Sequence, residues 1–308
     1  MVISRLTSLI GHLFLCGFLL VLTPAGAHAD LSSSQARKAI QTMAGASLPS
    51  EAVRVQAVRT SSAESAEATA ELHLVFRVTQ HKGLWRLNEV RTGPQRWERL
   101  DFLAQAAKIE LTNGDCDTPS QFARTADAEV LTNKRARCLV AELFGVTLPS
   151  DAVRIREVSP FGFSFGSADA AGLVDTLVQF DFRLVRERRG WQVAALKSGT
   201  RDWTDMRGIT ATVDQIKHST AANELSLIAQ ALDSYRRERG FYVVSDKESV
   251  LIDHLSPKYL TPVIRLDPWS RPYQYTGEQT TYSLRSLGPD GKPNTSDDIV
   301  VNNGSALR

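Results

Sequence analysis

The sequence lacks several features that would assign its class at once. Lys and Arg number 36 against 34 Asp and Glu, so there is no basic excess of the kind that nucleic-acid-binding proteins show. No run of 18 or more apolar residues follows position 30, and we therefore expect no membrane span in the mature chain. With 43% apolar and 23% charged residues over 308 positions, the composition argues against a disordered or collagen-like chain. The length predicts about two globular domains.

Catalytic motifs are also missing from the sequence. It contains no GxSxG, no HExxH, no CxxC and no glycine-rich phosphate loop followed by lysine. Four histidines follow position 30, and they are scattered: His73, His81, His218 and His254. We therefore expect a protein that is not an enzyme.

Residues 1–29 have the pattern of a secretory signal peptide. Arg5 gives the positive start, Leu13–Leu22 is an apolar core, and Ala27-His28-Ala29 is a small-x-small cleavage site before Asp30. The alternative is an uncleaved anchor, for which this apolar core is short. The pattern predicts a periplasmic or secreted protein.

Cysteine is rare, with three in the whole chain. Cys16 lies in the apolar core of the expected signal peptide, which leaves Cys116 and Cys138 in an oxidising compartment. A disulfide between them would close a loop of about 23 residues and stabilise the fold by ~3 kcal/mol. The alternative is two buried free thiols.

An internal repeat fills the first two thirds of the chain. The segment Leu48–Val55 returns as Leu148–Ile155, a shift of 100 residues. Further along the shift is 106, so the second copy carries six extra residues in the intervening loop; the matched pairs are Phe76 and Phe182, Trp85 and Trp191, Gly93 and Gly199, and Trp97 and Trp203. We interpret residues 30–101 and 135–207 as duplicated modules, joined by a connector at 102–134 that contains Cys116.

Each copy has the pattern of a helix followed by strands. Residues 36–44 and 136–144 have helical spacing, and Gly45 and Gly145 stand where left-handed caps belong. Alternating apolar residues then predict strands, with Lys82-Gly83 and Arg189-Gly190 as hairpin turns and a short helix at 102–109. Each module is thus expected to pack one helix on an antiparallel sheet of about three strands.

The tryptophans at equivalent positions have two interpretations. They can anchor the core of each module, or they can line a binding cleft. The second copy also carries the loop Phe161–Gly166, in which three aromatic residues alternate with Gly and Ser and could contact a partner or fold onto the sheet.

The last hundred residues carry the most specific signal. Apolar residues recur mostly at steps of three and four from 211 to 239, which predicts a long amphipathic helix that Gly240 ends: Val213, Ile216, Ala221, Leu225, Ile228, Leu232 and Tyr235. The segment D-P-W-S-R-P-Y-Q-Y follows at 267–275, an alternating strand at 282–286, and the loop S-L-G-P-D-G-K-P-N-T-S-D-D-I at 286–299.

On these motifs, residues 214–301 resemble the soluble part of the major pseudopilin, protein G, of type II secretion systems. The resemblance implies a long helix packed on a small antiparallel sheet, with a calcium ion in the final loop. By position, side-chain oxygens of Asp290, Asp297 and Asp298 would bind the ion, together with the backbone carbonyls of Leu287 and Thr295.

The residues of that loop agree with a calcium site on their own chemistry. Three carboxylates lie within nine residues of a Gly- and Pro-rich segment, and such groups repel unless they are solvated or share a cation. Oxygen donors without His or Cys favour calcium over zinc. The alternative is a solvated turn that only ends the strands.

The sequence also departs from the pseudopilin pattern. Pilin-like proteins open with a Phe-Thr-Leu-Ile-Glu-like segment and an apolar helix that holds the subunit in the membrane and later packs the filament core. No such segment precedes residue 216; Ser270 stands in place of a usual Gly, and Val243 in place of a usual Pro.

We therefore expect an α+β fold, with two tandem duplicated helix-on-antiparallel-sheet modules and then a pseudopilin-like domain at 208–308. The function that follows is an exported, non-catalytic protein whose calcium-stabilised domain contacts other proteins, such as secretion-system components. The alternative is a periplasmic ligand-binding or sensor protein that acts through the duplicated modules.

Overall fold

A computed structural model describes residues 30–81, 84–109, 111, 116, 130–160 and 170–303. The expected signal peptide, the Lys82-Gly83 turn and the loop Phe161–Gly166 lie outside these residues. Within them, no helix has both the length and the apolar character that a membrane crossing needs.

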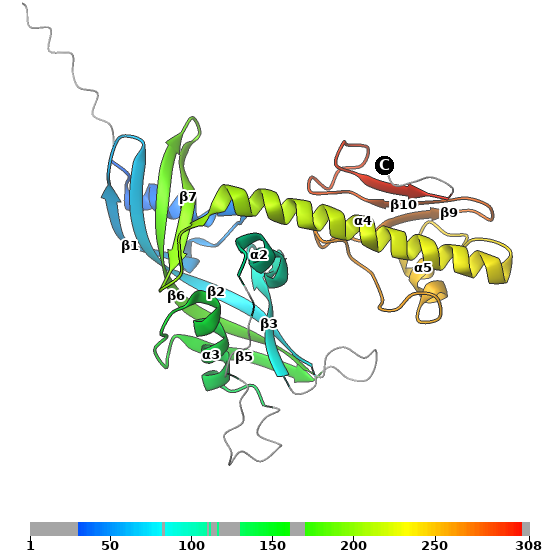
Figure 1. Cartoon of the computed structure of the whole chain (residues 1–308), viewed down its shortest axis with the longest axis horizontal. Coiled ribbons are helices and arrows are strands. Elements are labelled where there is room, and N and C mark those ends of the chain that lie inside the picture. The colour runs from blue at the N-terminus through cyan, green and yellow to red at the C-terminus, as the bar shows by residue number, and fades with distance from the viewer. Residues whose placement is uncertain are drawn as a thin grey trace, which may run out of the picture. The chain divides into compact units, whose positions relative to one another are not determined.

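The chain folds into two groups of elements (Figure 1). The first group is α1 (Ser33–Gln41), β1 (Val53–Thr60), β2 (Ser65–His81), β3 (Leu84–Arg91), β4 (Trp97–Arg99), α2 (Leu100–Ala107), α3 (Asn133–Phe144), β5 (Val153–Pro160), β6 (Ala170–Glu187), β7 (Gly190–Ser198) and β8 (Thr204–Asp205), with 3-10 turns at Met43–Gly45 and Ser50–Ala52. The long helix α4 (Met206–Arg239) leads into the second group: α5 (Glu248–Leu255), β9 (Gln274–Gly277), β10 (Tyr282–Ser286) and β11 (Ile299–Asn302).

The first eight strands form one antiparallel sheet rather than the two separate sheets that the sequence analysis expects. The order is β4-β3-β2-β6-β7-β8, with β1 also on β2 and β5 also on β6. The central strands are long enough for this arrangement, at 17 residues in β2 and 18 in β6. One edge of β2 pairs with β6 over residues 65–80, while its other edge is divided between β1 and β3.

The two halves of this sheet have the same strand order, and the register of β2 on β3 matches that of β6 on β7. The outer pairings differ by two residues, since Val53 pairs with Leu72 whereas Val153 pairs with Thr176. Leu72 pairs with Val178, and these two residues are themselves 106 positions apart. The β2–β3 ladder shifts register at Arg77, and the β6–β7 ladder shifts at Arg183, again 106 positions on. Each half has four strands and a following helix, α2 or the start of α4, rather than the three strands expected.

One face of the sheet is buried and the other is polar. Along β6, buried residues alternate with more exposed ones, as the sequence pattern predicts. The buried side chains share one core with α1, α3 and the start of α4; the largest are Trp85, Phe76, Phe182 and Ile40. The opposite face carries polar pairs such as Thr69 with Asp181, whose side-chain oxygens are 2.8 Å apart.

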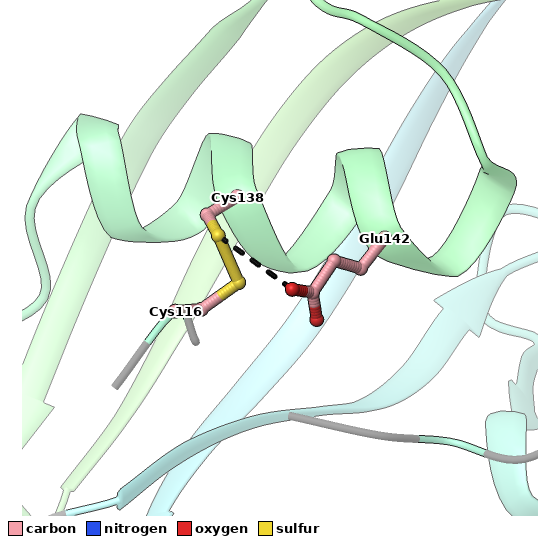
Figure 2. A group of neighbouring side chains, drawn as sticks. All are labelled: Cys116, Cys138 and Glu142. Atoms are coloured by element: carbon pink, nitrogen blue, oxygen red, sulfur yellow. Dashed lines mark hydrogen bonds between the residues drawn. A yellow bond between two sulfur atoms is a disulfide. The ribbon is translucent and has the colours of Figure 1, made fainter. Parts of the chain in front are cut away.

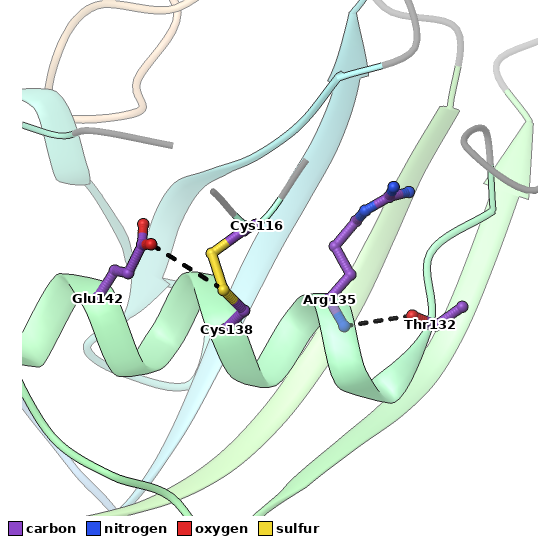
Figure 3. The surroundings of a disulfide bond; sticks show 5 residues. All are labelled: Cys116, Thr132, Arg135, Cys138 and Glu142. Atoms are coloured by element: carbon purple, nitrogen blue, oxygen red, sulfur yellow. Dashed lines mark hydrogen bonds between the residues drawn. A yellow bond between two sulfur atoms is a disulfide. The ribbon is translucent and has the colours of Figure 1, made fainter. Parts of the chain in front are cut away.

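Local signals set the limits of the helices. Ser32 and Gln35 form a capping box, so α1 begins at Ser33 and not at residue 36. Thr132 caps α3 through the N–H of Arg135 (Figure 3), and Gly145 ends that helix in the left-handed region.

Helix α4 contributes to two cores in succession. It has 34 residues, begins after the N-cap Asp205 and ends at Gly240, whose φ is 85°. Its first buried residue, Met206, belongs to the core of the eight-stranded sheet. From Ala221 onward its buried residues pack with β9, β10, β11 and α5 in the second core.

The C-terminal sheet has the order β11-β10-β9, and its strand at 282–286 is the one expected. Asp267 holds the connection before this sheet, because its buried carboxylate accepts the N–H groups of Trp269 and Arg271 and the hydroxyl of Ser286. The D-P-W-x-x-P-Y motif is therefore fixed by hydrogen bonds as well as by the burial of Tyr273.

Candidate functional site

The loop between β10 and β11 places two of the three expected acidic ligands at its surface. Asp290 Oδ1 accepts the N–H of Lys292 at 2.7 Å, and Asp297 Oδ2 accepts the N–H of Asp290 at 3.0 Å. Thr295 donates its hydroxyl to Asp297, and this hydrogen bond, followed by that from the Asp290 N–H, lowers the pKa of Asp297. These donors favour the charged form of the Asp297 carboxylate.

Asp298 differs from the other two because its side chain is buried, with 6% exposed. Its Oδ2 accepts the N–H of Asn294 at 2.7 Å and lies 3.4 Å from the guanidinium of Arg285. Its Oδ1 is buried and has no hydrogen-bond partner among the described residues. A buried carboxylate oxygen without a donor is costly, and a cation would satisfy it.

The backbone of this loop is tightly wound around Asp297. Gly288 has a φ of +57°, and a Cβ there would stand 2.3 Å from the carbonyl oxygen of Asp297, so the position requires glycine. The expected carbonyl ligands accept hydrogen bonds within the loop, Leu287 from the N–H of Gly291 and Thr295 from that of Asp298.

The loop carboxylates do not form a compact acidic cluster in this conformation. In the part of the chain that the structure describes, one group of three His, Cys, Asp or Glu side chains has ligand atoms within 4.8 Å of one another, and it is Cys116, Cys138 and Glu142. Figure 2 shows why this group is not a metal site: the two sulfur atoms are joined in a disulfide, beside the carboxylate. The structure thus pairs the two cysteines as the sequence analysis expects, with Cα atoms 5.6 Å apart.

A second candidate site is an apolar cavity of about 270 Å³ between the buried sheet face and helices α2 and α4. Its floor comes from the central strands and includes Leu72, Leu74, Phe76 and Phe180. Both halves contribute equivalent residues, 106 positions apart: Val90 and Leu196, Thr92 and Ser198, Glu98 and Thr204, Leu100 and Met206, Leu103 and Ile209, Ala104 and Thr210, Ala107 and Val213.

Charged residues gather where α4 passes this cavity. Lys217 Nζ lies 2.6 Å from Glu98 Oε2, and the two side chains are only 4% and 8% exposed. Arg96 donates from Nε and from its terminal nitrogen to the other oxygen of Glu98. One carboxylate therefore serves two cations, which leaves this cluster with a net positive charge.

Sequence reasoning missed the ion pair, although a signal for it exists. Lys217 lies four residues from both Val213 and Ala221, so it interrupts the apolar stripe of α4. A lysine in a buried stripe requires an anionic partner. The sequence pattern of α4 does not indicate which distant acidic residue is the partner of Lys217. In the folded chain the partner is Glu98.

The expected tryptophan and histidine positions are distributed through the fold. Trp85 is a core residue, with 1% exposed. Trp97 and Trp203 lie at equivalent places and stack against the guanidinium groups of Arg77 and Arg183, at 4.4 and 4.0 Å. These contacts favour the anchoring interpretation of the tryptophans.

His73 lies 3.9 Å from a carboxylate oxygen of Asp175 on the polar face of the sheet. His254 packs near the ring of Tyr235 in the C-terminal core, with ring centroids 5.9 Å apart. These two histidines therefore lie in different parts of the fold, and neither belongs to a hydrophobic core.

A half-buried acid links α4 to the segment before the C-terminal sheet. Glu224, on α4, accepts the hydroxyl hydrogen bond of Tyr273. Burial raises the pKa of Glu224, and the hydrogen bond from Tyr273 partly opposes this shift. Burial, together with the same hydrogen bond, raises the pKa of Tyr273. The pair fixes the helix to the sheet.

Comparison with known proteins agrees with the C-terminal fold. The family model of type II secretion system protein G matches residues 208–303. The crystal structure of the major pseudopilin from the type 2 secretion system of enterohaemorrhagic Escherichia coli matches with 26% identity, 29% of this chain and 90% of that chain covered, and a TM-score of 0.24. A search of curated proteins gives no match. The C-terminal third of this chain thus resembles the soluble domain of the major pseudopilin.

Proposed function

We propose that this is an exported, non-catalytic protein that contacts components of the type II secretion apparatus or of a related envelope assembly through residues 208–303. The match of these residues to the protein G family carries the proposal. The pseudopilin family is structural rather than catalytic, and its members work in the cell envelope. A periplasmic or secreted location fits both this family and the leader pattern of residues 1–29.

The test of this proposal is binding between purified proteins. The mature chain would be immobilised and exposed to the soluble domains of the pseudopilins encoded by the same organism. Saturable binding that a variant with a disrupted C-terminal core, Leu284→Asp, loses would support the proposal. If the wild-type chain binds none of them, the proposal is wrong.

We further propose that calcium stabilises the C-terminal loop through Asp290, Asp297 and Asp298, with the carbonyls of Leu287 and Thr295. The buried, unpartnered Oδ1 of Asp298 and the oxygen-only donor set support this. Binding would require the loop carboxylates to come closer together than they are in this structure.

Thermal unfolding of the mature chain in EDTA, calcium or magnesium tests the calcium site. At a hundred times its Kd, calcium should add about 2.7 kcal/mol, and magnesium much less. Asp298→Asn should abolish the calcium effect, while the control Asp246→Asn, outside the loop, should keep it. Equal melting temperatures in all three solutions would show that the loop is only a turn.

The duplicated modules give a second candidate function, the binding of a small ligand. The apolar cavity supports it, because both halves of the sheet and its helices contribute equivalent residues to one pocket. The shared strand order, the matching registers of β2 on β3 and of β6 on β7, and the equivalent Arg–Trp contacts support the duplication itself. Mass spectrometry of an organic extract of the protein from its native host tests this function, since a bound ligand would appear at about one molecule per chain.

A further inference from the structure

The cavity between the eight-stranded sheet and helices α2 and α4 has a chemistry that selects among ligands. We infer that it binds a medium-chain carboxylate, an acyl chain of roughly ten carbons that ends in a carboxyl group. This inference rests on the second candidate function and specifies the ligand class.

The size and lining of the cavity suit the acyl chain. An apolar cavity of about 150 Å³ takes up benzene, so by proportion a volume of about 270 Å³ holds roughly ten carbon atoms. The floor residues Leu72 and Phe76 are almost completely buried, and Leu100 and Ala104 close the cavity from α2. An apolar chain would remove this surface from water without leaving a polar group unpaired.

The polar groups at the cavity favour an anion at one end of the chain. The cavity is lined by four cationic and three acidic side chains. The cations are Arg91, Arg96, Arg201 and Lys217, and the acids are Glu98, Asp202 and Asp214. Arg96 and Lys217 share the one carboxylate of Glu98. Arg91 donates to the carbonyls of Gly93 and Pro94. The balance leaves positive charge for a ligand.

Arg201 is the group best placed to receive the carboxylate. Its terminal nitrogen donates to the carbonyl of Glu142 at 2.6 Å, and among the described residues it forms no ion pair. Its Nε–H is buried without an acceptor, and so is the hydroxyl of Thr92, which also lines the cavity. A carboxylate can accept the hydrogen bond of such a donor, whereas a hydrocarbon cannot.

The asymmetry between the two copies supports a directional ligand. The position equivalent to Arg201 in the first copy is Gln95, and the position equivalent to Glu98 in the second copy is Thr204. The apolar lining follows the pseudo-symmetry, while the charged residues break it. A molecule with one polar end and one apolar end fits that arrangement.

Calorimetry with decanoate, 1-decanol and acetate tests the inference on the mature chain. We expect one decanoate per chain, weaker decanol binding and no acetate binding. Arg201→Gln should weaken decanoate binding about tenfold or more, the loss of a hydrogen bond to a charged group, and change decanol binding little. The control Arg54→Gln, an exposed arginine outside the cavity lining, should leave both unchanged.

A second pair of variants tests the location. Ala104→Phe places a ring in the cavity and should abolish binding of both long-chain ligands, whereas Gln105→Phe, on the exposed side of α2, should not. Circular dichroism and the melting temperature check that each variant folds. Decanoate binding that neither Arg201→Gln nor Ala104→Phe weakens would overturn the inference.

Failure of this inference can be told apart from failure of the ligand-binding function. If decanoate does not bind but the native extract contains another molecule at one per chain, the ligand class is wrong and the function stands. If decanoate does not bind and the extract contains no ligand, both are wrong.

Discussion

The buried ion pair between Glu98 and Lys217 tests how α4 is held against the eight-stranded sheet. The pair joins β4 of the first module to the long helix, at the last turn before the helix enters the C-terminal core. Because water is excluded from both groups, removing one partner leaves the other charged and poorly solvated. The two single substitutions are expected to have unequal effects.

Glu98→Gln should be the more damaging change. It removes the one acid with which Lys217 forms an ion pair among the described residues, so a buried ammonium remains alone. Breaking a buried pair in this way costs about 3–5 kcal/mol of unfolding free energy. Lys217→Met should cost less, about 2 kcal/mol, because Arg96 still donates to Glu98 at 2.8 and 3.0 Å.

Urea unfolding of the two single variants and the double variant gives the coupling energy. The double variant should be more stable than Glu98→Gln alone, since it contains no unpaired buried lysine. Glu67→Gln is the control, because its pair with Arg183 is about half exposed and screened by solvent. Additive effects of the two single changes, or a loss below about 1 kcal/mol for Glu98→Gln, would refute the reasoning.

Three further predictions follow from other parts of the fold. Breaking the Cys116–Cys138 disulfide, which closes a 22-residue separation, should lower the unfolding free energy by about 3 kcal/mol in urea titrations with and without reductant; equal midpoints would contradict it. Because burial raises the folded-state pKa of Glu224 above 4.5, its contribution to stability is present at low pH and is lost as pH rises through the folded pKa. Wild type should therefore lose stability relative to Glu224→Gln as the pH rises above 4.5, and a constant difference would contradict this. Phe76→Ala and Phe182→Ala, at fully buried equivalent positions, should each cost about 3–5 kcal/mol in the same assay, and a clear inequality would argue against equivalent environments.

The similarity between the two halves of the sheet is visible in the sequence, but the way the halves pair could not be predicted from it. Side-chain alternation in β2 shows which residues face the core, and that pattern is the same whichever strand lies beside it. The pairing of Leu72 with Val178 joins the free edges of β2 and β6. The alternation of apolar and polar side chains along a strand does not show which strand pairs with its edge. A sheet in each copy was therefore the simplest expectation, and it was wrong.

The two candidate sites also differ in how far they could be recognised from the sequence. The loop residues Asp290 to Asp298 are close in sequence, so their number and type could be recognised from local spacing. The cavity is lined by residues from both copies, and only the assembled sheet brings them together. Glu98 and Lys217 are 119 positions apart, and neither carries a local signal that names the other.

The position of α4 constrains how a pseudopilin-like domain can work in this chain. In pilin-like proteins the first part of the corresponding helix is apolar and packs in the filament core. Here Met206 and Val213 are buried beside the eight-stranded sheet, and Lys217 is paired with Glu98. The first turns of α4 thus already have a partner within the same chain, and freeing them would expose both an apolar face and a buried ion pair. The first turns of α4 are therefore not available for the filament-core packing that pilin-like proteins use, whereas the part of the helix from Ala221 onward packs in the second core.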